Sequence, residues 1–314
     1  MLDITLKPTT LRSAVAEGKL YLPAETVAMV RNREVKKGDV AECARIAALM
    51  GLKKTAELLP HCHPLAVLDA SIDVLTQDDG LHVTARVRTI ASTGVEMEAL
   101  TAVSIALLCA YDMLKPHAPA IAMRIGDVHL AEKKGGKTQF QRKSGAAGGS
   151  RGNAAVLVLS DTVAAGNKPD TAGVAVRDGL ERAGFDIAAY EVMPDEPELL
   201  RACVERHVAD QVSCIITVGG TGLSPRDKTI EALQGLIDTD LPGFMETARA
   251  FGQARTPYAM LSRGIAGMAK HSFVATFPGS RKGAEETLAA VLPGLVHLIE
   301  VHRAQHAVHE GGYR

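Results

Sequence analysis

A segment without bulky apolar side chains divides this sequence near its middle. The segment is QRKSGAAGGSRGN, residues 141–153, and its glycine, serine and alanine content is typical of a flexible linker. The chain has 314 residues, a length that usually corresponds to about two domains. We therefore predict one domain over residues 1–140, a linker over 141–153, a second domain over 154–301 and a flexible tail over 302–314.

The first half combines helical and strand patterns. Apolar residues recur with a helical period over residues 23–34, 39–59 and 94–115. Over residues 66–90 they alternate with polar residues on either side of the turn sequence DDG, which predicts a β-hairpin. Residues 120–133 have the pattern of a further strand. Together these elements predict an α+β domain of ferredoxin-like type, with helices and an antiparallel sheet.

The second half alternates strands with helices. Buried strands are predicted over residues 153–160, 185–193, 212–222 and 272–279, and helices over residues 171–184, 196–209, 224–237 and 283–303. This order is typical of an α/β domain with a mostly parallel, doubly wound sheet.

Composition excludes several classes of protein. The formal net charge is -1 and aromatic residues make up 4%, with no basic patch interleaved with them, so we expect no nucleic-acid partner. No signal sequence is visible and no apolar run approaches the roughly 20 residues that span a bilayer, so we expect a cytoplasmic protein without membrane contact. A disulfide framework or structural zinc site is not expected, because the cysteines are odd in number and form no CxxC pair: Cys43, Cys62, Cys109, Cys203 and Cys214.

Small and acidic residues follow the predicted strands of the second half. Ligands of open α/β sheets bind beyond the carboxyl ends of the strands. The residues at these positions are Ser160 and Asp161, then Pro194, Asp195 and Glu196, then Gly219, Gly220, Thr221 and Gly222, and finally Pro278, Gly279 and Ser280. They predict a ligand site along one edge of the sheet.

The stretch TVGGTGLSPRD carries the strongest signal in this half. Its glycines let backbone N–H groups approach a phosphate, and a helix beginning after them favours an anion. Ser224 is expected as the N-cap of that helix, with Pro225 at its first position. Asp227 then lies in the first turn, either as a functional carboxylate or as the partner of Ser224 in a capping box. Neither a P-loop nor a GxGxxG fingerprint is present.

Six motifs in order give the second half a family resemblance. They are VLSDTVAAGNKPDTAG, MPDE, GGTGLSPRDKTIEAL, PGFMETAR, MLSRGIAG and FPGS. Over residues 153–301 the chain resembles the MogA/MoaB/gephyrin-G family of molybdopterin-binding proteins. Active members transfer AMP from Mg-ATP to the pterin dithiolene and release pyrophosphate.

The resemblance implies roles for residues at the predicted edge. Asp195 and Asp227 would serve catalysis and hold the Mg²⁺ of ATP. The cleft for pterin phosphate and nucleotide would be lined by Ser262, Gly219, Gly220, Thr221 and Gly222, with substrate contacts from Ser160, Asp161, Pro278, Gly279 and Ser280. Many members have Asn where this chain has Thr276, which bears on ligand contact at that point. The alternative is a scaffold that binds molybdopterin without adenylylating it.

In the first half, the stretch LLPHCHPL leaves three interpretations open. His61 and His63 share one face of an extended segment and could begin a metal site, but zinc sites normally have three or four protein ligands. Alternatively, Cys62 is a small packing residue and the histidines bond backbone groups. The third interpretation is acid/base or anion contact.

Charged residues elsewhere in this half favour the third interpretation. Lys36 and Lys37 precede a glycine turn, Asp112 and Lys115 lie one helical turn apart, and a helix begins with the acidic pair Glu96 and Glu98. For any one pair taken alone, a solvated salt bridge is the favoured interpretation. Together they suit an anionic substrate that requires proton transfers.

These residues belong to motifs that resemble another family. KKGDVAECARIAALMGLKKTAELLPHCHPL, STGVEMEALTAVSIALLCAYDMLK and AEKKGGKT are similar to the MoaC family, cyclic pyranopterin monophosphate synthase, over residues 1–140. The chain departs from the family at Gln139, where glycine is common. The resemblance implies an active site formed by Lys37, His63, Asp112, Lys115, Glu96 and Glu98, with Cys62 and Met97 beside the substrate.

The family's reaction requires no cofactor in this half. It converts the cyclised dihydro-GTP made by a radical SAM enzyme into cyclic pyranopterin monophosphate, with loss of pyrophosphate. Together the two resemblances imply a fused, bifunctional enzyme of molybdenum cofactor biosynthesis that uses Mg²⁺ and ATP only in its second half. They also imply a homo-oligomer, a trimer or a hexamer.

Overall fold

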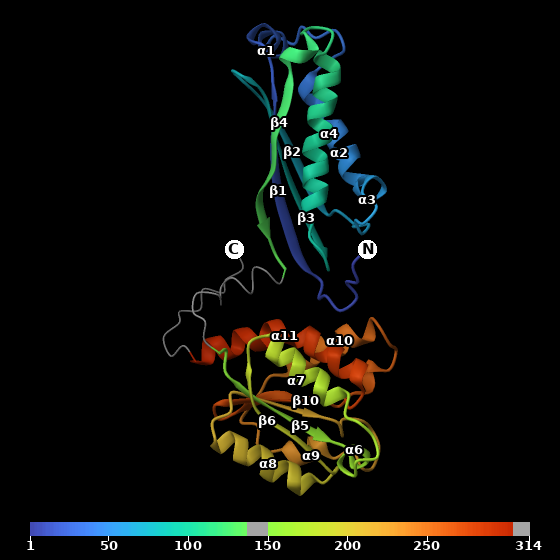
Figure 1. Cartoon of the computed structure of the whole chain (residues 1–314), viewed down its shortest axis with the longest axis vertical. Helices are drawn as coiled ribbons and strands as arrows, with labels where there is room; N and C mark the ends of the chain where they lie inside the picture. Colours follow the sequence, from blue (N-terminus) through green and yellow to red (C-terminus); the bar gives the residue numbers. More distant parts are fainter. Residues whose placement is uncertain (137–149, 304–314) are drawn as a thin grey trace. The chain divides into compact units, whose positions relative to one another are not determined.

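The chain forms two compact units, Met1–Ala146 and Ala147–Arg314. The computed structural model describes residues 1–136 and 150–303, and Figure 1 shows the elements of each unit. The predicted linker, 141–153, and the predicted tail, 302–314, lie mostly outside the described residues, so the proposed domain boundaries stay predictions.

The first unit contains a four-stranded antiparallel sheet in the order β2-β3-β1-β4. Its strands are β1 (Thr10–Tyr21), β2 (Asp69–Gln77), β3 (Gly80–Ala91) and β4 (Arg124–Lys134). Helices separate β1 from β2 and β3 from β4. This β-α-β-β-α-β arrangement confirms the predicted ferredoxin-like α+β class, and the hairpin over 66–90 is confirmed as β2 and β3.

The central strand β1 was missed by the sequence pattern. Its inward positions are Ala14, Ala16, Gly18 and Leu20, which alternate correctly but are mostly too small to give a strong apolar signal. Small residues are needed because helix α4 packs closely on this strand. A Cβ at Gly18 would lie only 2.7 Å from a side-chain carbon of Val103.

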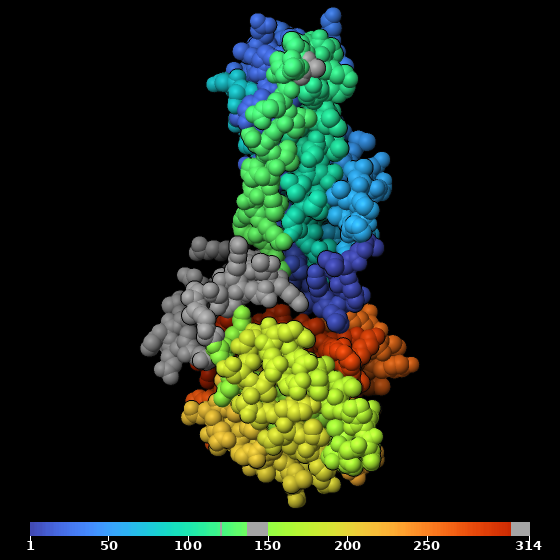
Figure 2. All heavy atoms as spheres, in the orientation of Figure 1, coloured from blue at the N-terminus to red at the C-terminus, as the bar shows by residue number. Residues whose placement is uncertain are grey.

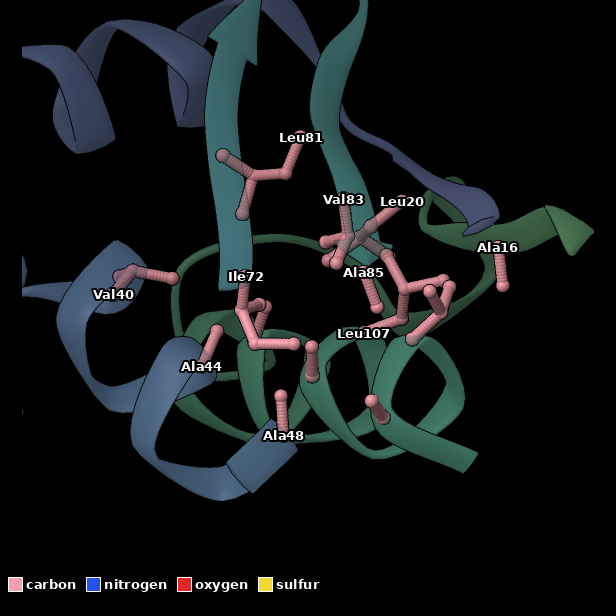
Figure 3. Packing of buried hydrophobic residues seen from close by; sticks show 14 of the residues in the cluster. Ala16, Leu20, Val40, Ala44, Ala48, Ile72, Leu81, Val83, Ala85 and Leu107 are labelled. Atoms are coloured by element: carbon pink, nitrogen blue, oxygen red, sulfur yellow. The ribbon is translucent and has the colours of Figure 1, made fainter. Parts of the chain in front are cut away.

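The helices of this unit are α1 (Ala24–Arg31), α2 (Val40–Lys53), α3 (Thr55–Leu58) and α4 (Glu96–Leu114), with a 3₁₀ turn, η1 (Ala120–Ala122). The helix predicted over 39–59 is thus interrupted at Lys54. Figure 1 shows α2 and α4 on the same side of the sheet. Figure 3 shows the apolar core between them, where Ala44 and Ala48 of α2 approach Ile72 of β2 and Leu107 of α4 lies near Ala85 of β3.

Helix α4 is more apolar than the sequence analysis allowed for. Among the described residues it is the one helix whose length and composition would suffice to cross a membrane. Half of its most apolar window is buried inside the unit, where Val103, Leu107 and Leu114 belong to the core. A core helix beneath a sheet accounts for this composition.

The second unit contains a six-stranded sheet in the order β6-β5-β7-β10-β9-β8. The strands are β5 (Asn153–Leu159), β6 (Asp186–Met193), β7 (Cys214–Val218), β8 (Thr239–Asp240), β9 (Ala266–Ala269) and β10 (Ser272–Phe277). The first four strands in the order are parallel, and β9 and β8 extend the sheet with antiparallel pairings. The predicted α/β class with a mostly parallel sheet is confirmed, whereas the two short strands were not predicted.

Helices cover both faces of this sheet, as Figure 1 shows. One layer consists of α7 (Ala172–Arg182), α10 (Pro242–Gln253) and α11 (Arg281–Arg303), and the other of α8 (Pro197–Ala209) and α9 (Thr229–Leu233). Two short elements, α6 (Asp161–Ala164) and η2 (Ala259–Leu261), complete the unit.

The helix predicted over 224–237 is wrong in its extent. Helix α9 begins only at Thr229, and residues 224–228 form turns. Ser224 and Pro225 are therefore not the N-cap and first residue of a helix. A helix of five residues also contributes little as an anion-binding N-terminus. The structure therefore does not support the anion-binding role predicted for the start of this helix.

Candidate functional site

Two lysines hold one carboxylate at the C-terminal end of α4. The Nζ of Lys37 donates to the backbone O of Asp112 over 2.8 Å and to its carboxylate over 3.2 Å. The Nζ of Lys115 lies 2.7 Å from the other carboxylate oxygen. Gly38, with φ +112°, and Asp39, which caps α2, form the turn that presents Lys37.

This lysine cluster is exposed and keeps its charges. Hydrogen bonds from Lys115 and Lys37 hold the pKa of Asp112 below its ordinary value, and Asp112 in turn raises the pKa of Lys115. All three side chains are substantially exposed. The cluster therefore presents a net positive charge to the solvent, which suits a phosphate-bearing ligand.

An acidic cluster lies at the other end of α4. Glu96 is the first residue of the helix and forms an ion pair with Lys133 of β4. Glu98 is only 4% exposed, and burial raises its pKa. Burial also raises the pKa of the Cys62 thiol, with smaller effects from Glu98 and Glu96, so Cys62 belongs to the same corner. A buried carboxyl group with a raised pKa is suited to proton transfer.

The HCH stretch lies in the loop that approaches this corner. His61 is exposed, whereas Cys62 and His63 are half-buried. Within residues 1–136 and 150–303, neither histidine belongs to a group of three candidate metal ligands. The roles implied for Cys62 and His63 stay predictions, and Met97, also predicted to lie beside the substrate, is exposed at the start of α4.

Arg12 is a neighbour of this corner that the sequence analysis missed. Its guanidinium donates to the backbone O of Ala91 over 3.2 Å and to that of Ser92 over 3.5 Å. Burial lowers its pKa, and the charge of Glu96 opposes that effect. Its place in the unrecognised strand β1 explains why no sequence signal indicated it.

The two clusters do not meet within one copy of the chain. They lie at opposite ends of α4, and Glu96 and Asp112 are 16 residues apart (112 − 96) on that helix. A rise of 1.5 Å per residue places them about 24 Å apart along its axis. The sequence therefore identified residues of a single proposed site that the fold divides into two groups.

In the second unit a cleft of about 240 Å³ opens at the carboxyl ends of the parallel strands. The predicted residues that line it are Ser160, Asp195, Gly219, Gly220, Asp227 and Gly279. They come from the ends of four neighbouring strands, the edge at which open α/β sheets bind ligands. Lys168, Asp170 and Thr171, from the loop before α7, also line the cleft and were not predicted.

The glycines after β7 are required by close approach of the backbone. Gly219 has φ +115°, and a Cβ there would lie 2.3 Å from the backbone O of Leu159. Gly220 has φ +63°, and its Cβ would meet the hydroxyl of Thr229 at 2.1 Å. Side chains at either position would displace neighbouring atoms and narrow the cleft.

Acidic side chains gather on one side of the cleft. The backbone N–H of Asp161 donates to the carboxylate of Asp195 over 3.3 Å, and the backbone N–H of Asp195 donates to the carboxylate of Asp161 over 3.2 Å. Arg226 lies 2.5 Å from the other carboxylate oxygen of Asp161. Burial raises the pKa of Asp195, and the charges of Asp161 and Asp227 raise it further. A cation here would relieve this repulsion.

Asp227 does form a local turn, as the capping alternative anticipated. Its Oδ2 accepts from the backbone N–H of Ser224 over 2.8 Å, but the turn is not a helix terminus. Arg263 fixes this turn from outside by donating to the backbone O of Asp227 over 2.6 Å and to that of Gly222 over 2.8 Å. Its third partner is Glu231, at 2.7 Å. Arg263 belongs to the motif MLSRGIAG, but no role was predicted for it.

The other predicted residues lie outside the cleft lining. The backbone O of Thr221 accepts a hydrogen bond from the N–H of Arg263. The hydroxyl oxygen of Ser262 accepts one from the N–H of Gly264. The hydroxyl oxygen of Ser280 accepts one from the N–H of Gly283, at the start of α11. Asp161, Gly222 and Pro278 are neighbours of lining residues rather than lining residues themselves. These positions support the loops that carry the lining.

Thr276 bears less on the cleft than its departure from the family pattern suggested. Its side chain is fully buried, and the N–H of Ile265 donates to its hydroxyl over 2.9 Å. It joins β10 to the segment before β9 and is not among the cleft residues.

Comparisons with known proteins divide the chain in the same way. Residues 1–136 match the MoaC family, and residues 155–297 match a family described as a probable molybdopterin binding domain. Each match lies within one of the two units.

Relatives with both domains span nearly the whole chain. A molybdenum cofactor biosynthesis bifunctional protein of Chlorobaculum tepidum is 39% identical over 95% of this chain and 92% of its own length. One of the same description from Synechococcus elongatus is 38% identical over 99% of this chain and its entire length. A cyclic pyranopterin monophosphate synthase of Thermomicrobium roseum is 48% identical over 46% of this chain and 86% of its own length.

Proposed function

Because this chain belongs to the family of molybdenum cofactor biosynthesis bifunctional proteins, we propose that its two units catalyse two separate steps of that biosynthesis. The first unit converts (8S)-3',8-cyclo-7,8-dihydro-GTP, the product of a radical SAM enzyme, to cyclic pyranopterin monophosphate with release of pyrophosphate. The second unit binds molybdopterin and adenylylates it with Mg-ATP.

The pairing of a lysine cluster with an acidic corner supports the first activity. Lys37 and Lys115 offer ammonium groups to a triphosphate, and Asp112 positions both of them. Burial raises the pKa of Glu98, which suits a group that donates and accepts protons. His63 and Glu96 are the further proton carriers in this corner.

A shared site between two copies reconciles these groups with one substrate. A triphosphate nucleoside cannot span the roughly 24 Å that separate the clusters along α4. A second copy running in the opposite direction would bring its lysine cluster to the acidic corner of the first. Symmetric dimers place the same surfaces against each other in this way, and the proposed homo-oligomer is then needed for catalysis.

The acid-lined cleft is the observation that supports the proposed activity of the second unit. Glycine backbone at Gly219 and Gly220 admits a phosphate group. Asp195 and Asp227 flank that position, and burial and acidic neighbours raise the pKa of Asp195. Lys168 and Arg226 supply positive charge at the rim.

The donor set fits Mg²⁺ delivered with ATP. Asp195 and Asp227 offer hard oxygen ligands, which Mg²⁺ prefers together with water and phosphate oxygens. When bound, Mg²⁺ would neutralise negative charge on the phosphates. The protein's own residues orient the nucleotide: the glycine turn admits the phosphate, and Arg263 keeps the Asp227 turn in place.

Separate assays test the two activities on the full chain. Cyclised dihydro-GTP should yield cyclic pyranopterin monophosphate and pyrophosphate without added metal. Molybdopterin with Mg-ATP should yield AMP-pterin and pyrophosphate, and ATP alone should yield neither. The alternative for the second unit is a scaffold, which would bind molybdopterin with no release of pyrophosphate from ATP.

A further inference from the structure

A cluster of metal-ligating side chains lies away from both sites. Glu191 of β6 and Cys203 and His207 of α8 have ligand atoms that all lie within 4.8 Å of one another. Among residues 1–136 and 150–303 this is the one group of three such side chains this close together. None of the three lines the cleft, and neither proposed activity uses them.

Helix and strand periodicity bring the three side chains together. Cys203 and His207 are four residues apart on α8 and share its inner face, where both are buried. Glu191 alternates with Ala189 and Met193 on the face of β6 that α8 covers. The carboxylate of Glu191 is half-buried at the edge of this apolar layer, where a cation or hydrogen-bond donors offset the loss of solvent.

The observed spacings approach those of a tetrahedral zinc site. The Sγ of Cys203 lies 3.6 Å from one oxygen of Glu191, and the Nε2 of His207 lies 2.9 Å from the other. Bond lengths to zinc of about 2.0–2.3 Å at tetrahedral angles require roughly 3.6 Å between sulfur and oxygen and roughly 3.4 Å between nitrogen and oxygen. Because the two contacts reach different oxygens of Glu191, an ion bound through one of them requires the carboxylate and the His207 ring to shift.

A guanidinium group competes for the same ligands. The Nη2 of Arg206 donates to the two oxygens of Glu191 over 2.6 and 2.8 Å and lies 3.3 Å from the Sγ of Cys203. The side chain of Arg206 is 55% exposed, and Figure 2 shows residues in the yellow part of the sequence, which includes α8, on the outer surface of this unit. Arg206 can therefore turn towards the solvent without opening the core.

We propose that Glu191, Cys203 and His207 form a binding site for a thiophilic divalent cation of the Zn²⁺ type, and that Arg206 occupies the site in competition with the ion. Sulfur, imidazole and carboxylate ligands together select zinc over magnesium or calcium. On binding, the Cys203 thiol loses its proton to the solvent, Arg206 withdraws, and water completes the coordination. The site joins the strand and the helix on either side of Asp195.

Cadmium provides a direct probe, because its bonds to thiolate absorb in the ultraviolet. The metal-stripped full chain is titrated with Cd²⁺, and the thiolate charge-transfer band is followed, with Zn²⁺ as competitor. We expect a band that Cys203→Ser abolishes and Cys43→Ser, the matched control, leaves unchanged. Arg206→Gln removes the competing charge and should tighten binding about tenfold or more.

Two results would overturn the site. One is a band of full intensity in Cys203→Ser, which would assign the thiolate to another cysteine. The other is Arg206→Gln binding Cd²⁺ no more tightly than the unmodified chain. If circular dichroism shows that Cys203→Ser does not fold, Glu191→Gln replaces it in the test. Glu191→Gln should then bind Cd²⁺ more weakly than the unmodified chain. No arm of this test depends on the proposed synthase or adenylyltransferase activity.

Discussion

Glu96 and Asp112 stand at opposite ends of one helix, α4, and each belongs to a different charged cluster. Glu96 pairs with Lys133 at the N-terminal end, and Asp112 pairs with Lys37 and Lys115 at the C-terminal end. A rigid helix keeps the two clusters about 24 Å apart along its axis in every copy. Any reaction that uses both clusters on one small substrate must draw them from two copies.

The first prediction is that inactive variants of the two clusters restore each other. Lys37→Ala removes a phosphate-binding ammonium, and Glu98→Gln removes the buried acid, so each alone should abolish formation of cyclic pyranopterin monophosphate. When subunits are exchanged in equal amounts, half of the pairs are mixed and each contains one intact site. The mixture should recover about a quarter of the unmodified activity, as expected for a site shared across a two-fold axis.

The matched control mixes Lys37→Ala with Lys115→Ala. Both lysines belong to the same cluster, so no mixed pair contains an intact site and activity should stay absent. Recovery in this control, or its absence in the first mixture despite proven exchange, would contradict the shared site.

The second prediction concerns His63. His63→Ala should abolish synthase activity while leaving the melting temperature and the zinc content of the protein unchanged, because we propose that the HCH loop contacts substrate rather than a structural metal. Elemental analysis and thermal unfolding measure this. Zinc retained by the protein should instead depend on Cys203, so Cys203→Ser serves as the comparison. Loss of zinc and of folding together in His63→Ala would restore the metal interpretation.

The third prediction separates chemistry from binding at Asp227. Asparagine can still accept the N–H of Ser224, so Asp227→Asn should keep the turn and the fold. Adenylyl transfer should fall by on the order of 10²-fold or more, as when a catalytic or metal-positioning group is lost. Affinity for molybdopterin should change much less, because an anionic ligand gains little from a nearby carboxylate.

Both quantities are measured on the same Asp227→Asn protein, with Asp178→Asn as a control carboxylate outside the cleft. An equal loss of transfer and binding would show that the division of roles is wrong. If the unmodified protein shows no transfer that depends on Mg-ATP, the scaffold alternative holds.

The fourth prediction follows from the raised pKa of Asp195. Its pKa in the folded protein lies above the ordinary value of 3.8 because of burial and neighbouring acids. Its contribution to stability is therefore fully present below that ordinary value and is lost as pH rises through the folded pKa. At neutral pH, Asp195→Asn should melt roughly 1–4 °C higher than the unmodified chain, and the difference should vanish in acid.

Thermal unfolding across pH checks this, and Mg²⁺ provides an independent readout. Added Mg²⁺ should narrow the difference in melting temperature, since a cation relieves the same repulsion. An Asp195→Asn protein that is less stable at neutral pH would argue that the carboxylate is held by favourable contacts.

The fifth prediction concerns Arg263 as a positioning residue. Lysine at this position keeps the positive charge near Glu231 but cannot donate in fixed geometry to the backbone oxygens of Gly222 and Asp227 together. Arg263→Lys should therefore lower the kcat of adenylyl transfer by up to about 10²-fold with a smaller change in KM, as a small misplacement of a catalytic group does. If Arg263→Lys and Glu231→Gln change kcat and stability by the same amounts, Arg263 and Glu231 form only a structural ion pair.

The class of each unit and six of the residues that line the cleft could be predicted from the sequence. The alternation around DDG specified the β2–β3 hairpin, because a period of two places one set of side chains on a single face. In the second half, buried strands followed by helices specified parallel pairing, and parallel strands bring their carboxyl ends to one edge. Asp195, Gly219 and Asp227 could therefore be assigned to that edge from the sequence alone.

Features that depend on contacts between distant segments could not be predicted from the sequence. Strand β1 forms because Ala14, Ala16 and Gly18 fit beneath α4, a packing constraint that a weak apolar pattern does not reveal. Residues 224–228 form a turn rather than a helix because Arg263, distant in sequence, holds the backbone oxygens of Gly222 and Asp227. The length of α4 likewise places the residues of one predicted site at two ends of a helix. A motif in the sequence does not show which copy of the chain supplies its residues to a shared site.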